Sequence, residues 1–260
     1  MCLEDVTIDD LFISGLKIIQ PRSGYRFGID AVLLSGFARL SDNCRVADLG
    51  SGSGAVPLLL VARQGNIEVS GLEIQPDMAE LARRSVNLNG LADRVFIFEG
   101  DIKAPPPQLK KGRFDVVVTN PPYLRKNQGR VNPSPGLALA RHEMACSLDD
   151  VIRTAGSLLR YRGQFCMIHR TDRLAEALDR LREHGLEPKR LRLVHPALNR
   201  DSNLFLVESV KGGHPGVTVE PPLAIYDAKG EYTPDVLDIY AGSAPPRSVR
   251  RGATSGAGNK

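Results

Sequence analysis

The residues best suited to chemistry in this sequence are Asn120-Pro121-Pro122-Tyr123, which follow a predicted strand. An amino group conjugated to an aromatic ring is a poor nucleophile because its lone pair is delocalised. The Asn120 side-chain oxygen and the Pro121 carbonyl would each accept one of its N–H hydrogens and orient it. Tyr123 would stack on the ring, while the two prolines restrict the loop and favour a fixed attack geometry. The segment therefore predicts group transfer to a planar amine.

A second candidate is the turn Asp48-Leu49-Gly50-Ser51-Gly52-Ser53-Gly54, between a predicted strand and a predicted helix. Glycine at every second position permits positive φ and lets a ligand approach the backbone closely. The spacing is neither the GxGxxG of dinucleotide sites nor a P-loop ending in Gly-Lys-Ser/Thr. Asp48 would repel a pyrophosphate but would accept hydrogen bonds from a cofactor with ammonium and sulfonium charge. The turn thus favours S-adenosylmethionine, a donor of methyl groups.

Two further acids follow predicted strands. Glu73 ends the second strand, about 20 residues after the glycine turn, where a carboxylate can accept both ribose hydroxyls. Asp101 follows the third strand and is placed to accept an adenine amino hydrogen. Carboxylates at strand ends are often solvated or cap a helix, so each acid alone is a weak signal. Their order after the glycine turn predicts one cofactor site.

The strands and helices that position these residues can be predicted from the sequence, because short β-branched runs alternate with helical patterns. The predicted strands span residues 45–49, 68–74, 95–99, 114–119, 164–169, 190–194 and 204–209. The predicted helices span residues 29–38, 55–63, 76–88, 147–161 and 171–184. Pro76 suits a first turn, Ser147 and Thr171 suit N-caps, and Asn89-Gly90 and Gly185 suit C-terminal stops.

Strands joined by helices predict an α/β fold with a mostly parallel, doubly wound sheet. The last two strands have no helix between them, so they are expected to pair antiparallel around the loop 195–203. In such sheets ligands bind beyond the carboxyl ends of the strands, which is where the candidate residues fall.

The chain resembles the class I S-adenosylmethionine-dependent methyltransferases with an NPPY amine-methylation motif, most of all the tRNA1(Val) (adenine-N6)-methyltransferase family. The resemblance covers about residues 22–210. Besides the glycine turn and NPPY, it rests on Tyr25-Arg26-Phe27-Gly28-Ile29-Asp30-Ala31 and on Ala140-Arg141-His142-Glu143. It implies a Rossmann-like fold with a seven-stranded, mostly parallel sheet, S-adenosylmethionine as cofactor, tRNA as partner and N6-methylation of an adenine beside the anticodon.

The resemblance also implies roles for individual residues. The expected catalytic residues are Asn120, Pro121, Pro122 and Tyr123. The expected cofactor contacts are Tyr25, Phe27, Asp30, Asp48, Gly50, Ser51, Gly52, Gly54, Glu73, Ile74, Asp101, Ile102 and Asn120. The expected substrate contacts are Arg125, Lys126, Arg130, Arg141 and His142. The mechanism needs no acid or base at His142, and Tyr25 and Phe27 would equally serve to pack the first helix.

Basic charge gathers in two segments. The net charge of +4 arises from residues 243–260, which contain four basic residues and no acid and whose composition predicts a disordered tail. Between residues 103 and 130, seven basic residues accompany a single acid, Asp115. Basic groups on both flanks of NPPY favour an anionic polymer as substrate. The seven are Lys103, Lys110, Lys111, Arg113, Arg125, Lys126 and Arg130.

The length of 260 residues and the 42% apolar content suit one domain over residues 1–242, with a core at about 22–210 and a C-terminal extension at 211–242. The acidic start MCLEDVTIDD does not suit a signal peptide and no apolar run suits a membrane span, so a cytoplasmic location is expected. Four scattered cysteines and five ungrouped histidines predict neither a disulfide framework nor a metal site. The oligomeric state is left open.

Other functions stay open at this point. NPPY also suits methylation of protein glutamine, as in release-factor methyltransferases, or of guanine-N2 in ribosomal RNA. Release-factor enzymes usually carry an N-terminal helical domain, and only a short segment precedes Tyr25 here. DNA adenine methylation is disfavoured by the lack of a target-recognition insert. A non-catalytic RNA-binding protein with a decayed pocket is opposed by intact Asp48, glycines and NPPY.

Overall fold

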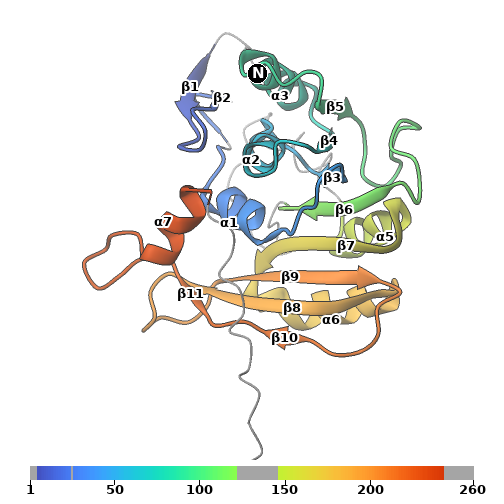
Figure 1. Ribbon diagram of the computed structural model, residues 1–260, viewed down its shortest axis with the longest axis vertical. Helices are drawn as coiled ribbons and strands as arrows, with labels where there is room; N and C mark the ends of the chain where they lie inside the picture. The colour runs from blue at the N-terminus through green and yellow to red at the C-terminus, as the bar shows by residue number, and fades with distance from the viewer. Residues whose placement is uncertain (1–4, 25, 122–145, 243–260) are drawn as a thin grey trace, which may run out of the picture.

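The computed structural model describes residues 5–24, 26–121 and 146–242, so the predicted tail lies outside the described residues. Within them, a nine-stranded sheet runs in the order β10-β8-β9-β7-β6-β3-β4-β5, with β11 also paired to β8 (Figure 1). Its strands are β3 (Arg45–Leu49), β4 (Glu68–Glu73), β5 (Val95–Glu99), β6 (Phe114–Thr119), β7 (Leu159–Arg170), β8 (Leu186–His195), β9 (Leu204–Lys211), β10 (Thr218–Val219) and β11 (Leu223–Ala224).

The sheet confirms the predicted fold class. β3 to β7 pair in parallel, and β9 pairs antiparallel with both β7 and β8, as the missing helix between the last two strands predicted. All seven predicted strands are present. Two short strands, β10 and β11, join β8 in addition, because the C-terminal extension folds back along that strand.

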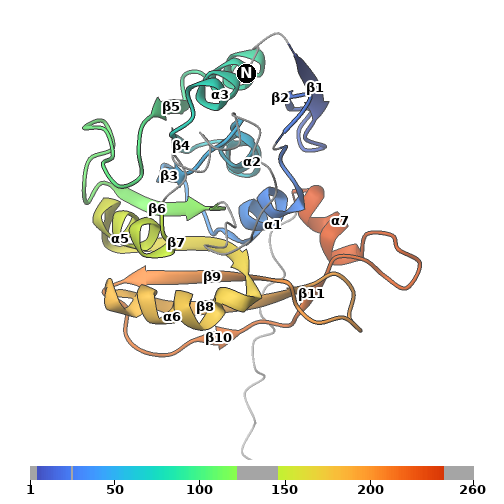
Figure 2. The ribbon, with the colours of Figure 1, turned by 180° about the vertical axis from the view of Figure 1, so that it is seen from behind.

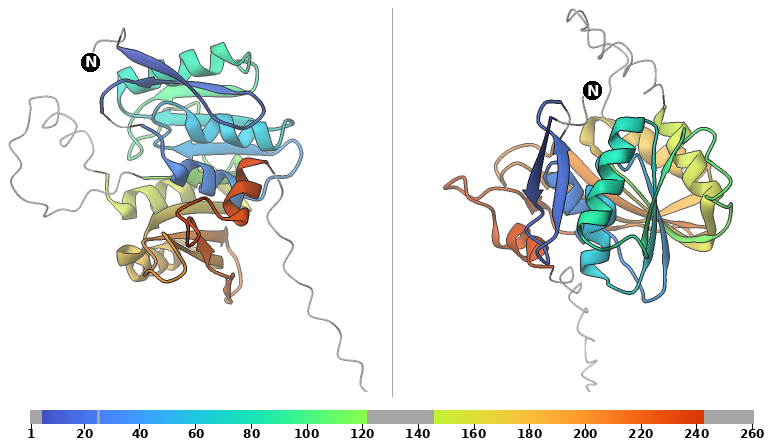
Figure 3. Two further views of the ribbon diagram at one scale, coloured as in Figure 1. Left: turned by 90° about the vertical axis from the view of Figure 1, so that its left-hand side faces the viewer. Right: turned by 90° about the horizontal axis from the view of Figure 1, so that it is seen from above.

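Helices cover both faces of the sheet. They are α1 (Ile29–Phe37), α2 (Ala55–Arg63), α3 (Pro76–Leu88), α5 (Leu148–Leu158), α6 (Leu174–Glu183) and α7 (Pro234–Tyr240). One core cluster joins α1, α2 and α7 to the sheet, and a second joins α5 and α6 to it. Figure 2 looks onto the face with α5 and α6, and the right-hand view of Figure 3 shows the sheet between helices. No helix in the described part of the chain has the length and apolar content of a membrane span.

Most of the predicted helix boundaries are confirmed. Pro76 begins α3, and the left-handed residues Gly90 (φ 66°) and Gly185 (φ 70°) follow α3 and α6. The predicted N-cap at Thr171 is wrong, because Thr171 begins a 3-10 turn, η1 (Thr171–Arg173), and its buried hydroxyl has no hydrogen-bond partner in the described part of the chain. The helix predicted over 147–161 ends earlier, at Leu158, because the chain turns into β7.

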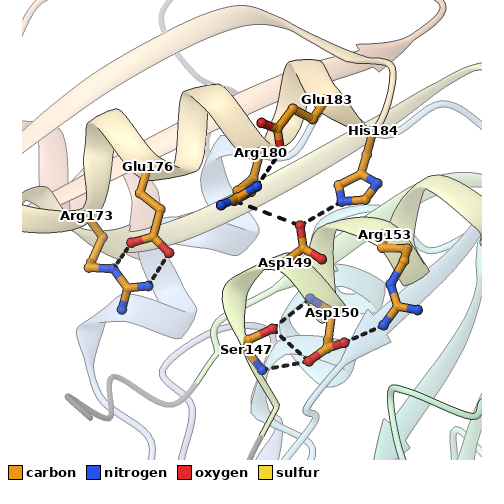
Figure 4. Close-up of polar contacts among 9 residues, drawn as sticks. All are labelled: Ser147, Asp149, Asp150, Arg153, Arg173, Glu176, Arg180, Glu183 and His184. Atoms are coloured by element: carbon orange, nitrogen blue, oxygen red, sulfur yellow. Dashed lines mark hydrogen bonds and ion pairs between the residues drawn. The ribbon is translucent and has the colours of Figure 1, made fainter. Parts of the chain in front are cut away.

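The start of α5 is fixed by polar contacts, which Figure 4 shows. The Ser147 hydroxyl accepts a hydrogen bond from the Asp150 N–H at 3.1 Å, and the Asp150 carboxylate accepts one from the Ser147 N–H at 3.0 Å. Asp149 lies 2.8 Å from the His184 ring nitrogen, at the end of α6. Ser147 is thus the N-cap that the sequence predicted, and α5 and α6 are tied together.

A hairpin of β1 (Val6–Asp10) and β2 (Lys17–Pro21) forms a separate two-stranded sheet that sequence reasoning missed. It lies beside α3: the Ile19 N–H donates to the Ser85 hydroxyl at 2.9 Å. Gln20 is buried, and its side-chain oxygen accepts a hydrogen bond from the Phe27 N–H at 2.8 Å. The hairpin therefore holds the segment that leads into α1.

Candidate active site

The carboxyl ends of β3, β4 and β6 bring the predicted site residues to one edge of the sheet. Leu49 pairs with Leu72 on one side and with Thr119 on the other. Asp48 therefore lies between the strands that end in Glu73 and Thr119, and Asn120 directly follows the latter. The Thr119 hydroxyl donates a hydrogen bond to the Leu49 carbonyl at 2.8 Å. This buried bond fastens the start of the NPPY segment to the glycine turn.

The glycine turn has the backbone conformation that its spacing predicted. Gly50, Gly52 and Gly54 have φ of 82°, 54° and 91°, a left-handed region that strains other residues. The N–H groups of Gly50 and Ser51 donate to the Leu72 carbonyl at 2.8 and 3.0 Å. Gly54 then forms the N-cap of α2. The turn is thus built on the end of β4 and opens directly into a helix.

Asp48 is fully buried, and neither of its carboxylate oxygens has a hydrogen-bond partner among the described residues. Burial raises the pKa of the Asp48 carboxyl to about 7; the nearby Ser51 hydroxyl opposes the rise and the charge of Glu73 adds to it. A buried polar group without a partner is costly. The arrangement therefore leaves an acceptor that a ligand donor would satisfy.

Glu73 is also buried, but its carboxylate is engaged. One oxygen accepts the Gly52 N–H at 2.8 Å and the other accepts the Gln75 N–H at 2.9 Å. Burial raises the pKa of Glu73, while these N–H groups oppose the rise. Each carboxylate oxygen has a second lone pair, so contacts to ribose hydroxyls stay compatible with both bonds. Glu73 thus holds the glycine turn in addition to its expected role.

The residues after β4 and β5 complete this edge. Ile74 is half-buried. The Asp101 carboxylate accepts the Lys103 N–H at 2.8 Å and lies 3.6 Å from the Lys103 ammonium. Ile102 packs against the second core cluster, and its carbonyl accepts a hydrogen bond from the Thr154 hydroxyl of α5 at 2.8 Å. The turn after β5 is therefore anchored to α5 and presents Asp101 at the strand end.

The predicted segment before α1 is described in part. Phe27 packs against the first core cluster. Asp30 lies in the first turn of α1, whose N-cap is Gly28. Tyr25 lies outside the described residues. Contact of this segment with a cofactor stays a prediction.

The NPPY motif is also described in part. Asn120 is half-buried and Pro121 is buried, both directly beyond β6. The other predicted catalytic and substrate residues lie outside the described residues: Pro122, Tyr123, Arg125, Lys126, Arg130, Arg141 and His142.

Sequence reasoning missed two residues that shape the site, Gly71 and Thr119. Gly71 lies beside Asp48 in the sheet, and a Cβ on it would lie 2.5 Å from the Ser51 hydroxyl oxygen. Only glycine leaves room for the turn to fold over β4. An isolated glycine within a strand pattern is a known signal of close backbone approach and would have indicated it. No sequence signal distinguishes Thr119 from other strand threonines.

A family model described as methyltransferase small domain matches residues 29–184. The chain belongs to this methyltransferase family. It is 30% identical over 233 residues to a tRNA1(Val) (adenine(37)-N6)-methyltransferase from Porphyromonas gingivalis, covering 85% of this chain and 89% of that one. A relative of the same name from Parabacteroides distasonis is 27% identical over 189 residues, covering 73% and 78%.

The methyltransferase fold is also seen in solved structures. The structure of a predicted O-methyltransferase from Agrobacterium tumefaciens superposes with a TM-score of 0.67 at 30% identity, covering 83% of this chain and 97% of that one. S-adenosylmethionine is the cofactor of this methyltransferase. The described residues fit such a cationic ligand, because two buried acids and left-handed glycines lie together and both Asp48 oxygens lack a partner.

Proposed function

We propose that this methyltransferase transfers a methyl group from S-adenosylmethionine to N6 of an adenine in tRNA, beside the anticodon. The observation that carries the proposal is the place of Asn120. Its neutral amide directly follows β6, whose last residue, Thr119, is hydrogen-bonded to the glycine turn. A neutral acceptor suits a base amine, and relatives that span most of the chain are named for this reaction.

In this proposal the chain holds the cofactor at the carboxyl edge of the sheet. Asp48 accepts hydrogen bonds from the cofactor's charged methionine end, with Phe27 and Asp30 beside it. Glu73 accepts from the ribose hydroxyls while it keeps its bonds to Gly52 and Gln75. Asp101 accepts from the adenine amino group. The remaining contacts come from Tyr25, Gly50, Ser51, Gly52, Gly54, Ile74, Ile102 and Asn120.

Methyl transfer then depends on orientation. The bound cofactor supplies an electrophilic methyl carbon, whose bond to sulfur breaks as the amine nitrogen bonds to it, the electron pair staying on sulfur. Asn120 and the Pro121 carbonyl each accept one N–H of the target amine and aim its lone pair at this carbon. Tyr123 stacks on the base, and Pro122 limits the motion of the segment. The proton leaves the nitrogen to solvent as the new bond forms, so no separate base is needed.

An anionic RNA substrate is supported by the basic residues that follow NPPY in the sequence. We assign Arg125, Lys126, Arg130, Arg141 and His142 to contacts with the RNA. An anticodon loop presents its bases unstacked, which lowers the cost of placing one in the site. A tRNA partner in turn implies a cytoplasmic location. A single domain over residues 1–242 is proposed to carry the whole activity.

The test is methyl transfer from labelled S-adenosylmethionine to unmodified tRNA, ribosomal RNA and release factor in parallel, followed by mass spectrometry of digested nucleosides. N6-methyladenosine formed in tRNA alone is the expected result. Label in release factor, or N2-methylguanosine in ribosomal RNA, would overturn the substrate. A 2′-O-methyl nucleoside would overturn the acceptor atom and would agree with O-methylation, for which the Agrobacterium tumefaciens neighbour is named.

A further inference from the structure

A group of basic residues lies at the edge of the sheet opposite to Asn120, where β6 begins. The Gly112 and Arg113 N–H groups donate to the carbonyls of Ser157 and Leu158, both at 3.0 Å. Phe114 then pairs with Leu159. These contacts place the segment Lys110–Arg113 beside the start of β7. We call the following residues the amino-edge patch: Arg45, Lys110, Lys111, Arg113, Arg160, Tyr161 and Arg162.

The start of β7 presents its part of the patch through an unusual bulge. Phe114 pairs with Leu159, but Val116 pairs with Gln164, so residues 160–163 lie opposite Asp115 alone. Arg162 has φ of 65°, a left-handed conformation that is uncommon for arginine. A Cβ on Gly163 would lie 2.9 Å from the Arg160 carbonyl oxygen. The backbone is thus locally strained at the bulge, where residues 160–162, Arg-Tyr-Arg, are exposed.

Tyr161 is 71% exposed in the middle of these charges. One side of its ring lies against Gly212, where a Cβ would come within 2.4 Å of the ring carbon Cε2. The Arg162 guanidinium reaches the Gly212 carbonyl at 3.5 Å. The ring is therefore held in place by glycine backbone while most of it stays open to solvent.

The charge of the patch is mostly positive. Two acids border it. Glu68 lies opposite Arg45 on β4, and the Asp115 carboxylate pairs with the Arg160 guanidinium and accepts the Arg45 N–H at 2.8 Å. Across the described residues, no ion pair engages Lys110, Lys111, Arg113 or Arg162, and all four are exposed. Exposed cations around an exposed aromatic ring form the surface that binds a nucleic-acid backbone and stacks on a base.

We propose that the amino-edge patch is a second RNA-binding surface, which contacts phosphates of the substrate with Lys110, Lys111 and Arg113 and an unpaired base with Tyr161. The inference rests on the proposed function, because it assigns the partner to the same RNA. The six residues of β6 separate the patch from Asn120 by roughly 20 Å. A single nucleotide in the active site cannot reach it, so the patch selects a folded RNA that extends beyond the target loop.

The test compares tRNA binding by two doubly substituted variants. The patch variant is Lys110→Ala/Lys111→Ala, and the matched control is Lys17→Ala/Lys229→Ala, which removes two exposed lysines from the β1–β2 hairpin and from the C-terminal extension. Fluorescence anisotropy with an unmodified tRNA transcript is measured from 50 to 200 mM salt. Each lost phosphate contact lowers the slope of log affinity against log salt by about 0.7 to 0.9. With equal affinities extrapolated to 1 M salt, the loss of two contacts lowers the affinity of the patch variant roughly 25- to 60-fold near 0.1 M salt, while the control matches the wild type.

Tyr161 is tested separately. Tyr161→Ala should weaken tRNA binding by roughly 5- to 150-fold, the equivalent of one lost stacking contact, whereas Tyr161→Phe should keep the affinity. Competition between poly-aspartate and tRNA for the wild-type protein shows whether negative charge alone is enough for binding to the patch. The inference would be overturned if the patch and control variants lost equal affinity for tRNA, or if Tyr161→Ala bound tRNA as tightly as the wild type. It would also be overturned if poly-aspartate competed for the protein as effectively as unlabelled tRNA does.

The same samples are assayed for N6-methyladenosine, which separates this inference from the proposed function. If wild-type protein binds tRNA through the patch but forms no N6-methyladenosine in it, the proposed function fails and the RNA surface stands. If the patch variant binds and methylates tRNA as the wild type does at every salt concentration, the inference fails and the function stands.

Discussion

The buried carboxyl of Asp48 makes cofactor affinity depend on pH. Its pKa is raised to about 7 by burial, and a cationic ligand needs the ionised form. The ionised fraction is then about one half at pH 7 and about one hundredth at pH 5. Because apparent affinity scales with the competent fraction, the dissociation constant of S-adenosylmethionine should rise about 50-fold from pH 7 to pH 5. Measurements above pH 7.5 are avoided, since an α-amino group itself titrates at about 7.7 to 8.0.

Isothermal titration calorimetry tests this directly. At pH 6, in two buffers of different ionisation enthalpy, the wild type should release about 0.9 proton for each cofactor bound, because that fraction of Asp48 is protonated beforehand. Asp48→Asn should bind more weakly, with little dependence on pH and no proton release. Asp93→Asn, at an exposed position, is the matched control and should behave as the wild type. Wild-type affinity that stays constant from pH 5 to 7 would refute a contact between Asp48 and a charged group of the cofactor.

The same pKa shift affects the free energy of unfolding. The folded pKa of Asp48 lies above the unfolded value of about 3.9, so the native state holds the proton more tightly. The stabilisation is complete below pH 4 and is lost as pH rises through 7, by about 4 kcal/mol. His169 changes the free energy of unfolding in the opposite direction. Burial lowers the pKa of its imidazole to about 4, so its contribution to folded-state stability grows as pH rises from 4.

Asp48→Asn isolates the Asp48 contribution from that of His169. Relative to wild type, the variant should gain about 3 kcal/mol of stability between pH 5 and pH 8, as measured by urea unfolding without cofactor. A difference between the two proteins that does not change with pH would show that Asp48 is not buried in its acid form.

Three further substitutions test the geometry of the site. Asn120→Ala should remove most turnover and leave cofactor affinity nearly unchanged in calorimetry; near-normal turnover would remove the amide from the mechanism. Gly71→Ala should weaken cofactor binding at least tenfold, because its Cβ would lie 2.5 Å from the Ser51 hydroxyl oxygen, and unchanged affinity would show that the turn is not held there. Thr119→Val removes the 2.8 Å hydrogen bond to the Leu49 carbonyl and should lower the free energy of unfolding by about 1 kcal/mol, or by more if that carbonyl is left unsatisfied. We expect kcat to fall more than cofactor affinity. Equal losses in kcat and cofactor affinity would show that Thr119 supports only the fold.

The sequence predicted the parts of the fold whose local signals agree with their packing. β3 and α2 match their predicted bounds because a β-branched run, a glycine turn and an apolar helix follow one another. β10 and β11 could not be predicted, because two-residue strands carry no periodicity and exist only through pairing with β8. The end of α5 was missed since Leu159 and Tyr161 continue a helical pattern that the sheet overrides.

The same limit applies to the candidate site. Residue types and spacing indicated that Asp48, Glu73 and Asn120 each lie near a strand end, and the parallel sheet brings those ends together. Spacing does not show that the Asp48 carboxylate has no partner among the residues that the structure describes, while Glu73 is hydrogen-bonded to the turn. Those differences arise from depth in the sheet, which depends on contacts between distant segments.

The basic run between residues 103 and 130 shows how a strand changes the meaning of a sequence pattern. In the sequence, the charges of Lys110 to Arg113 lie as close to Asn120 as those that follow it. In the fold β6 separates Lys110, Lys111 and Arg113 from Asn120, so these three residues lie at the opposite edge of the sheet. A ligand that contacts both Asn120 and these charges must span the length of β6, roughly 20 Å. The charges before β6 therefore cannot contact the same nucleotide as Asn120, and their closeness to NPPY in the sequence does not carry over to the fold.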